Sequence, residues 1–317
     1  YKLCRRTAGP NMTFLRQLSH DSAMLKSAYA ACNTFLLPSW LETPSLAALE
    51  AGLAGAKIVI TREGATTEYF LNFADYVSPD NTAEIRETTL RSFDKPKNSN
   101  LREHIVANFL WKNTADKTLE VYRHALAPTR ERLLNNTIYT KRRLRIGLDL
   151  QAMVGPQTGL GKYSECLVQE FQKRRGDKYE FYVYQPGPLH SKYLSTMSRL
   201  YWSNRQLIDN VEKNQMDLLH VLAFAPPLRA RIPVVVTVHD LIERSYRNQL
   251  GLPSRFYWGY WISKTIKSAS RIIAVSHHTK KDLIRYLGLP ESKIDVIYPS
   301  GHEGFSPRLD PDKFKEL

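Results

Sequence analysis

Two glutamates, Glu42 and Glu50, are separated by seven residues, and their spacing is the feature of this sequence that best suits a binding or catalytic site. They bracket three small residues, Thr43, Pro44 and Ser45, that lead into a helix predicted to begin at the proline. The start of a helix presents unpaired N–H groups and a partial positive charge, so it suits a phosphate. A carboxylate two turns further on can accept hydrogen bonds from both hydroxyls of a ribose. Together these groups predict one half of a sugar-nucleotide site.

The surroundings of this pair resemble the E-x7-E signature of family-4 glycosyltransferases of the GT-B fold. The resemblance covers about 18–126, with "LLPS" shortly before Glu42 and "AGLAGAKIVIT" directly after Glu50. It implies that the loop between the acids holds the donor diphosphate, that the first acid lies by the donor sugar as a catalytic residue, and that the second holds the ribose. The donor-binding residues implied here are Thr43, Pro44, Ser45, Leu46 and Glu50. The family's usual Gly-Phe-Gly after the first acid is replaced by Thr-Pro-Ser. Outside this context, two acids at this spacing are more simply a loop acid and a solvated helix residue.

Gly64 and Glu68 follow a strand predicted over 57–61 and occupy the place of the family's "G…E" acid. The resemblance implies that both residues line the donor side of the cleft. Alternatively, Glu68 is a first-turn carboxylate that stabilises a helix dipole. Both interpretations are open at this stage.

The strand pattern restarts over 144–150 and runs into a glycine-rich loop, VGPQTGLGKY, before a helix predicted over 163–174. Gly159 and Gly161 lack a Cβ, so the backbone can approach a phosphate or a sugar closely there. They do not form the dinucleotide-binding fingerprint. From 144 to about 307 the chain resembles the N-terminal, acceptor-side domain of the same family, in segments such as "IGLDLQAMVGPQTGLGKY", "VVVTVHDLI" and "SASRIIAVSHHTKKDLIRYLGLPESKIDVIYPSG".

His239 follows an apolar strand predicted over 234–238, so its imidazole should project into a cleft at the strand's carboxyl end. The resemblance implies that this histidine lies close to the donor sugar and helps to position it. The alternative is a histidine whose hydrogen bonds are satisfied within the fold.

Alternating strands and helices predict an α/β protein with two doubly wound, Rossmann-like parallel-sheet domains of the GT-B type, the first one truncated. A short strand with its exit loop is predicted over 11–18, and further strands span 34–37, 57–61, 144–150, 179–184, 218–222, 234–238, 271–275 and 294–297. The predicted domains are a partial C-terminal nucleotide-sugar-binding domain over 1–127, a linker over 128–143, and the N-terminal acceptor-side domain of a second glycosyltransferase over 144–317. A window cut from a tandem enzyme is the favoured account of this order, and a circularly permuted unit with one shared cleft is the other.

The net charge of +14 is concentrated in the second part of the chain, because residues up to 127 contribute only +2 and the remainder +12. An anionic membrane face or a lipid pyrophosphate would suit such a surface. Because nucleic-acid-binding motifs are missing, a nucleic-acid partner is not expected.

No metal or other cofactor is expected. Three scattered cysteines fit a reducing compartment. His277 and His278 are adjacent, so their side chains diverge on a helix that Ser276 should cap. A D-x-D at 310–312 follows no strand.

The resemblance implies a cytoplasmic hexosyltransferase-type enzyme that transfers a sugar with retention from a nucleotide-sugar to a glycan or lipid-linked glycan. Surface polysaccharide synthesis, such as that of lipopolysaccharide, is the expected setting, with peripheral contact at the inner membrane face. The alternative is a non-catalytic sugar-nucleotide-binding or scaffold module.

Overall fold

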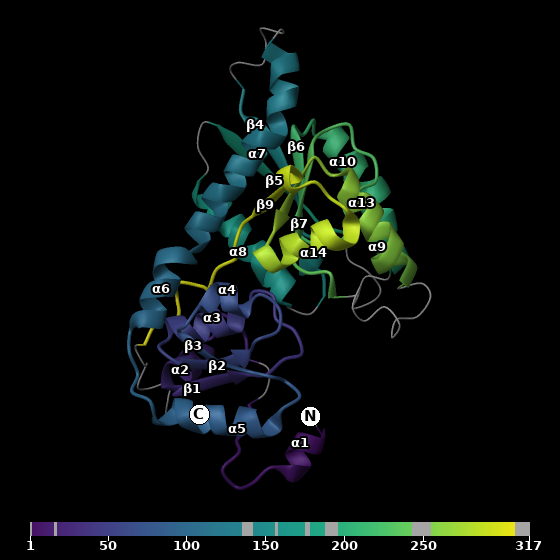
Figure 1. The fold of residues 1–317 in the computed structure, drawn as a ribbon. Helices are drawn as coiled ribbons and strands as arrows, with labels where there is room; N and C mark the ends of the chain where they lie inside the picture. Colours follow the sequence, from purple (N-terminus) through teal and green to yellow (C-terminus); the bar gives the residue numbers. More distant parts are fainter. Residues whose placement is uncertain are drawn as a thin grey trace.

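The computed structural model describes residues 2–15, 18–134, 142–155, 158–174, 178–187, 196–242 and 255–307. These residues form a three-stranded and a six-stranded sheet, each covered by helices (Figure 1). Every pair of neighbouring strands is parallel. The predicted α/β class with Rossmann-like parallel sheets is therefore confirmed, whereas the GT-B assignment stays a prediction.

The small-sheet body contains the sheet β1-β2-β3 and the helices around it. The apolar strand β2 is buried along almost its whole length, as expected for a parallel strand covered on both faces. Helix α3 packs on α6 on one face, and α5 covers the other. Its elements are α1 (Lys2–Thr7), α2 (Ala23–Ala31), β1 (Thr34–Leu37), α3 (Leu46–Leu53), β2 (Lys57–Thr61), α4 (Thr66–Phe70), β3 (Ala74–Val77), α5 (Thr82–Asp94) and α6 (Asn100–Asn108).

The large-sheet body contains the sheet β5-β4-β6-β7-β8-β9. Its elements, after the connecting helix α7 (Trp111–Leu134), are β4 (Leu144–Asp149), the 3-10 turn η1 (Gln151–Met153), α8 (Gly159–Lys173), β5 (Tyr179–Tyr184), α9 (Thr196–Tyr201), the π-helical turn η2 (Trp202–Gln206), α10 (Leu207–Lys213), β6 (Leu218–Val221), β7 (Val234–Val238), the π-helical turn η4 (Arg255–Trp261), α13 (Ile262–Ser268), β8 (Arg271–Ala274), α14 (His277–Leu287), the 3-10 turn η5 (Glu291–Lys293) and β9 (Ile294–Val296).

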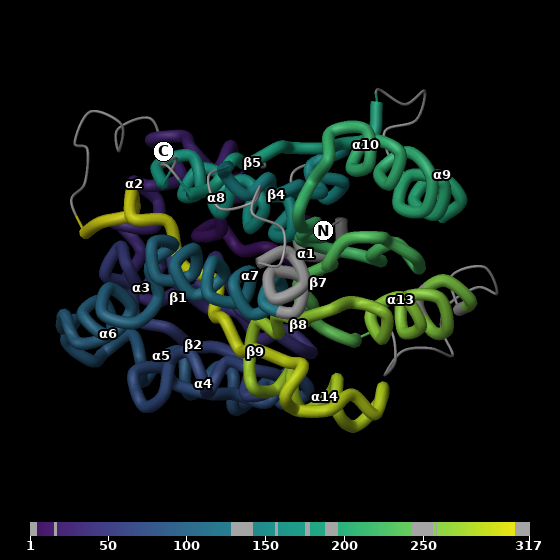
Figure 2. The backbone as a smooth tube through the Cα atoms, turned by 90° about the horizontal axis from the view of Figure 1, so that it is seen from above, coloured from purple at the N-terminus to yellow at the C-terminus, as the bar shows by residue number. Residues whose placement is uncertain are grey.

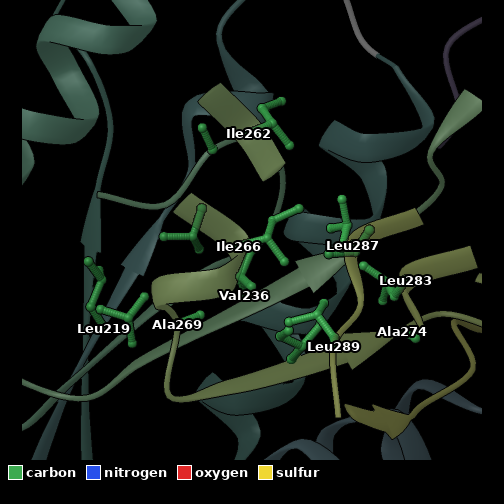
Figure 3. Close-up of a cluster of buried hydrophobic side chains, with 14 of the residues drawn as sticks. Leu219, Val236, Ile262, Ile266, Ala269, Ala274, Leu283, Leu287 and Leu289 are labelled. Atoms are coloured by element: carbon green, nitrogen blue, oxygen red, sulfur yellow. The ribbon is translucent and has the colours of Figure 1, made fainter. Parts of the chain in front are cut away.

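Side chains of the large sheet alternate between two apolar cores, as the period of a β-strand requires. On β7, Val234, Val236 and Val238 face the core formed with α10, α13 and α14, whereas Val235 faces the core formed with α7 and α8. Figure 3 shows part of the first core, where Ile266 of α13 and Leu283 of α14 lie against the strands. Helices therefore cover both faces, which is the doubly wound arrangement predicted.

Two segments cross between the bodies. Helix α7 runs from the small-sheet body along the large sheet (Figure 1), and buries Trp111, Leu119 and Tyr122 in the core that α8 shares. In the opposite direction, the segment 298–307 follows β9 and buries Phe305 in the core of the small-sheet body. Each body therefore completes the core of the other.

Several elements differ from the sequence prediction. The strand expected over 11–18 is wrong for its described residues, which are irregular, because Met12 and Leu15 stay exposed and find no strand to pair with. The short strand β3 was not predicted. Helix α2, for which the sequence suggests Asp21 as a cap, is capped by Ser22, whose hydroxyl accepts from Leu25 N at 3.2 Å. Helix α7 continues to Leu134, past the predicted boundary at 127, and the domain assignment remains a prediction.

Candidate functional site

The loop that carries Glu42 is fixed through its backbone. Glu42 N donates to the Glu63 carbonyl at 3.2 Å, and Ala65 N donates to the Glu42 carbonyl at 2.8 Å, which makes an isolated parallel bridge with Gly64. Gly64 has φ +97°, and a Cβ there would overlap the Glu42 carbonyl oxygen. The glycine therefore permits two loops at the carboxyl ends of β1 and β2 to touch.

The Glu42 side chain is half-buried, as are Thr43 and Pro44 beside it. Burial raises the pKa of Glu42, and a hydrogen bond with the Ser39 side chain offsets part of this rise. A carboxyl of this kind can hold a proton closer to neutral pH than an exposed glutamate does.

Ser45, not Pro44, sets the start of α3. Its buried hydroxyl accepts from Ala48 N at 3.3 Å, so Ser45 is the N-cap and the helix begins at Leu46. The Leu46 side chain packs against the core of the large-sheet body. The start of α3 therefore faces the interface between the two bodies.

Glu50 lies on the second turn of α3 and is only 4% exposed. His20 Nε2 is 2.6 Å from Glu50 Oε1. Burial of the ring opposes its charged form, but the hydrogen bond and the charge of Glu50 outweigh that effect and raise the pKa of His20. One oxygen of this carboxylate is thus already bonded within the fold.

Lys162 of α8 reaches the same place from the large-sheet body. Its Nζ lies 3.3 Å from Asp21 Oδ1 and 3.2 Å from Glu165 Oε2, and the residue is 5% exposed. Because Asp21 is adjacent to His20, the structure brings the first turns of α8 close to Glu50.

Gly159 and Gly161 lie within the first turn of α8, because the helix begins four residues earlier than the predicted Tyr163. Thr158 is the N-cap and accepts from Gly161 N at 3.2 Å. A Cβ at Gly161 would lie 3.1 Å from the Ala152 carbonyl oxygen, whereas a Cβ at Gly159 would meet nothing within 4 Å. Gly161 therefore serves close packing against η1, and Gly159 leaves an open surface at the helix start.

Glu68 binds the start of a helix in the other body. Its two carboxylate oxygens accept from His277 N and His278 N, each at 2.7 Å, and the Tyr298 hydroxyl donates at 3.1 Å. The carboxylate thus meets the positive end of α14. Ser276 caps the same helix, as predicted, and accepts from Thr279 N at 3.0 Å.

His239 lies at the end of β7, beside a cavity of about 90 Å³ that its ring helps to line. Its Nε2 is 3.0 Å from the Leu222 carbonyl oxygen, and its ring meets the edge of Tyr163 at 4.7 Å between centroids. Burial lowers its pKa, and the Leu222 carbonyl and Asp240 offset this only in part, so the imidazole is neutral near pH 7. Its backbone carbonyl accepts from Thr279 on α14 at 3.0 Å.

A buried chain of polar side chains supports this region, and sequence reasoning missed it. Tyr122 Oη lies 2.6 Å from His220 Nδ1, His220 Nε2 lies 2.8 Å from Thr237 Oγ1, and Thr237 Oγ1 lies 3.5 Å from the Tyr163 hydroxyl. Burial lowers the pKa of His220 to about 3, so the ring is neutral. A histidine inside the otherwise apolar run LLHVLA was the available signal.

Within the described ranges, no cluster of three or more His, Cys, Asp or Glu side chains has a metal-binding arrangement. The D-x-D at 310–312 lies outside the described residues, and the expectation of no metal stays a prediction. None of the helices in the described part of the chain combines the length and apolar character needed to cross a membrane.

Together, the fold and the residues at its strand ends define an α/β protein whose two parallel-sheet bodies meet through polar contacts such as that of Lys162 with Asp21. Residues 159–300 match the family model of Glycosyltransferase Family 4. An MMP alpha-(1->4)-mannosyltransferase of Mycolicibacterium hassiacum is 34% identical over 114 residues, which cover 33% of this chain and 27% of that protein. The chain thus spans about a quarter of that relative's length. Residues 159–300 are thus similar to family-4 glycosyltransferases, and the resemblance predicted from the sequence is confirmed for this segment.

Proposed function

We propose that this chain takes part in glycosyl transfer with retention, from a nucleotide-sugar to a glycan acceptor in surface polysaccharide synthesis. The family-4 match over residues 159–300 is the observation that carries this proposal. The similarity to a mannosyltransferase supports a hexosyl donor. The same proposal places this glycosyl transfer in the cytoplasm, at the inner face of the membrane.

In this proposal the two bodies supply opposite walls of the donor site. Glu42 supports the donor sugar, Glu50 binds the ribose through its remaining oxygen, and Thr43 and Ser45 face the phosphates. His239 positions the sugar from the opposite wall, as a neutral hydrogen-bonding group.

The remaining donor-side residues shape the wall that carries Glu42 and Glu50. Pro44 and Leu46 orient the start of α3, Gly64 holds the loop of Glu42, and Glu68 ties this wall to α14. The open start of α8 at Gly159 offers its N–H to the leaving diphosphate, while Gly161, whose N–H donates to Thr158, lets this start pack closely against η1. Stabilisation of that charge is the step that this arrangement serves best.

The mutual exchange of α7 and 298–307 supports one cleft shared by the two bodies. Each segment completes the core of the other body, so the bodies are held face to face. This arrangement favours the circularly permuted account over two separate, incomplete sites of a tandem enzyme.

Replacing Glu50 tests the donor site. Glu50→Ala should weaken binding of the matching donor by about tenfold or more, because the ribose hydroxyls lose their acceptor. Titration calorimetry with UDP-glucose, GDP-mannose and ADP-glucose measures this effect. Glu87→Gln, on the exposed face of α5, is the matched control and should bind as the parent does. Donor affinity that is equal in Glu50→Ala and in the parent would contradict the ribose role.

A non-catalytic binding or scaffold module is the second candidate. It is favoured by the observation that Glu50 and Glu68 already hold partners within the fold. Release of free sugar or its transfer to an acceptor separates the two candidates, since a scaffold would bind donor without turnover.

Peripheral membrane contact is proposed for η4 and α13. Phe256 and Tyr260 are 52% and 56% exposed there, and Lys264 lies 5.8 Å from the Tyr260 ring centroid. Co-sedimentation with anionic vesicles should fall when both aromatic residues are replaced by Ser, and unchanged co-sedimentation would refute the contact.

A further inference from the structure

The crevice between β4 and β6 is the switch point of the large sheet. After β4 the chain turns to β5 on one side, whereas after β6 it proceeds to β7 on the other. In open parallel sheets, ligands bind beyond the carboxyl ends of the strands at such a point. Asp149 and Phe224 lie at these two ends.

Asp149 anchors the π-helical turn η2 to this crevice. Its buried carboxylate accepts from Trp202 Nε1 at 2.9 Å, and from the Gln151 backbone and side-chain amides at 3.2 and 2.6 Å. Three donors therefore occupy the acid. Burial raises the pKa of Asp149 to about 6, although these hydrogen bonds oppose that rise.

Arg199 lies one helical turn before Trp202, so the anchor also places this guanidinium. It lies over the Phe224 ring, 3.9 Å from the centroid, and donates to Gln151 Oε1 at 3.5 Å. No carboxylate of the described residues lies within ion-pair distance of it. A guanidinium has five N–H donors, so most of those on Arg199 are unused by the described part of the protein.

The residue under the guanidinium has a strained backbone. Phe224 has φ +66°, in the left-handed region that side chains other than glycine rarely adopt. A strained backbone conformation of this kind persists only where the surrounding structure enforces it, and such residues are concentrated at binding sites. Here it presents an aromatic face on which a planar cation stacks.

A partly apolar cavity adjoins this cation. The same Phe224 lines the cavity of about 90 Å³ beside His239, together with Leu241, Ile262 and Ile266 on its apolar side and Thr237 and Asp240 on its polar side. Helices α9 and α13 lie on the same side of the large-sheet body in both views (Figures 1 and 2). The crevice thus offers a planar cation next to a partly apolar hollow, in the part of the chain that carries a net charge of +12.

We propose that Arg199 binds a phosphate group of the acceptor, whose apolar part lies in the cavity bordered by Phe224. A phosphate suits the unused fork of N–H donors, and it is the charged group that joins a glycan to a lipid. This inference rests on the proposed function, since it names the chemical class of acceptor for that site.

Octyl phosphate is the probe for this site, titrated below its micellar concentration into the full chain and followed by calorimetry. We expect Arg199→Gln to weaken binding by about tenfold, and Arg199→Lys to bind with intermediate affinity because it keeps the charge but loses the planar fork. Arg205→Gln is the matched control, because Arg205 lies on η2, is exposed and pairs only with Asp209 among the described residues. It should bind octyl phosphate as the parent does.

Neutral octyl glucoside and inorganic phosphate separate the two parts of the proposal. Each should bind at least about tenfold more weakly than octyl phosphate, because each lacks one of the two contacts. Equal affinity of octyl phosphate for the parent and Arg199→Gln, or equal loss in Arg205→Gln, would overturn the role of Arg199. Inorganic phosphate binding as tightly as octyl phosphate would overturn the apolar contact.

Folding and donor binding are checked separately. If Arg199→Gln lowers the melting temperature, the comparison is made with Arg199→Lys, for which a several-fold loss is expected and unchanged affinity refutes the proposal. The assay contains no nucleotide-sugar. Failure of donor binding at Glu50 would therefore refute the proposed function and leave this result standing, whereas loss of octyl phosphate binding alone would remove only this inference.

Discussion

The two segments that cross between the bodies join them by different kinds of contact. Helix α7 enters the large-sheet body with a row of buried apolar residues and one buried hydrogen bond, from Tyr122 to His220. The segment 298–307 contributes the buried Phe305 to the small-sheet core, with the partly buried Tyr298 packed against that core, and the Tyr298 hydroxyl also donates to Glu68. The first junction is an extended hydrophobic core, whereas the second combines a smaller apolar contact with polar contacts beside the candidate site. If the bodies move relative to each other, α7 should stay docked, and the contacts of Glu68 with α14 and of Asp21 with Lys162 should open.

Removing Tyr122 should have the largest effect on this comparison. Tyr122→Ala leaves a cavity and a buried histidine without its partner, so the free energy of unfolding should fall by about 3–5 kcal/mol. Denaturant unfolding measures the change. Tyr260→Ala, at an exposed position, should stay within about 0.5 kcal/mol of the parent. A loss below about 1 kcal/mol for Tyr122→Ala would mean that α7 is not docked in this core.

A smaller effect is expected at the polar junction. Glu68→Gln replaces one acceptor of the α14 start by an amide, so stability should fall by about 1–2 kcal/mol. The backbone amides of His277 and His278 should exchange hydrogen faster, while amides of the α7 core keep their protection. Unchanged exchange at both amides would show that Glu68 does not hold the helix.

The smallest effect concerns the pair of His20 and Glu50. Because the pKa of His20 is raised in the folded protein, the stability that this pair supplies is fully present below about pH 6.5 and is lost as the pH rises through the raised value. Glu50→Gln should lower the His20 pKa, and an NMR titration of the imidazole measures it. An equal His20 pKa in the parent and in Glu50→Gln would contradict the contact at 2.6 Å.

The sequence was most informative where local pattern and burial agree. Strands such as β2 and β7 are short apolar runs buried on both faces, so their composition identified them without knowledge of their neighbours. The helix cap at Ser276 was likewise predictable, because a cap depends on its own few residues. The start of α8 was misplaced because two glycines are typical of a loop, yet tertiary packing of Gly161 against Ala152 retains them in the helix.

The polar contacts of the site were harder to predict, because they join residues far apart in the chain. The contact of Lys162 with Asp21 depends on how the two bodies face each other, and the bond from His20 to Glu50 joins a loop to a helix 30 residues away. Arg199 was overlooked for the same reason. Its neighbours Phe224 and Gln151 come from different strand ends, and no spacing in the sequence marks them as a group.

Because of the backbone bridge between Glu42 and Gly64, the position of this acid does not depend on the identity of the residues that follow it. Main-chain hydrogen bonds hold the acid in place, so Thr43, Pro44 and Ser45 are free to vary without displacing it. In such a loop, evolution or protein design can replace the three residues to suit another donor without moving the carboxylate. The family's Gly-Phe-Gly and the Thr-Pro-Ser of this chain would then be two alternative sequences on the same backbone framework.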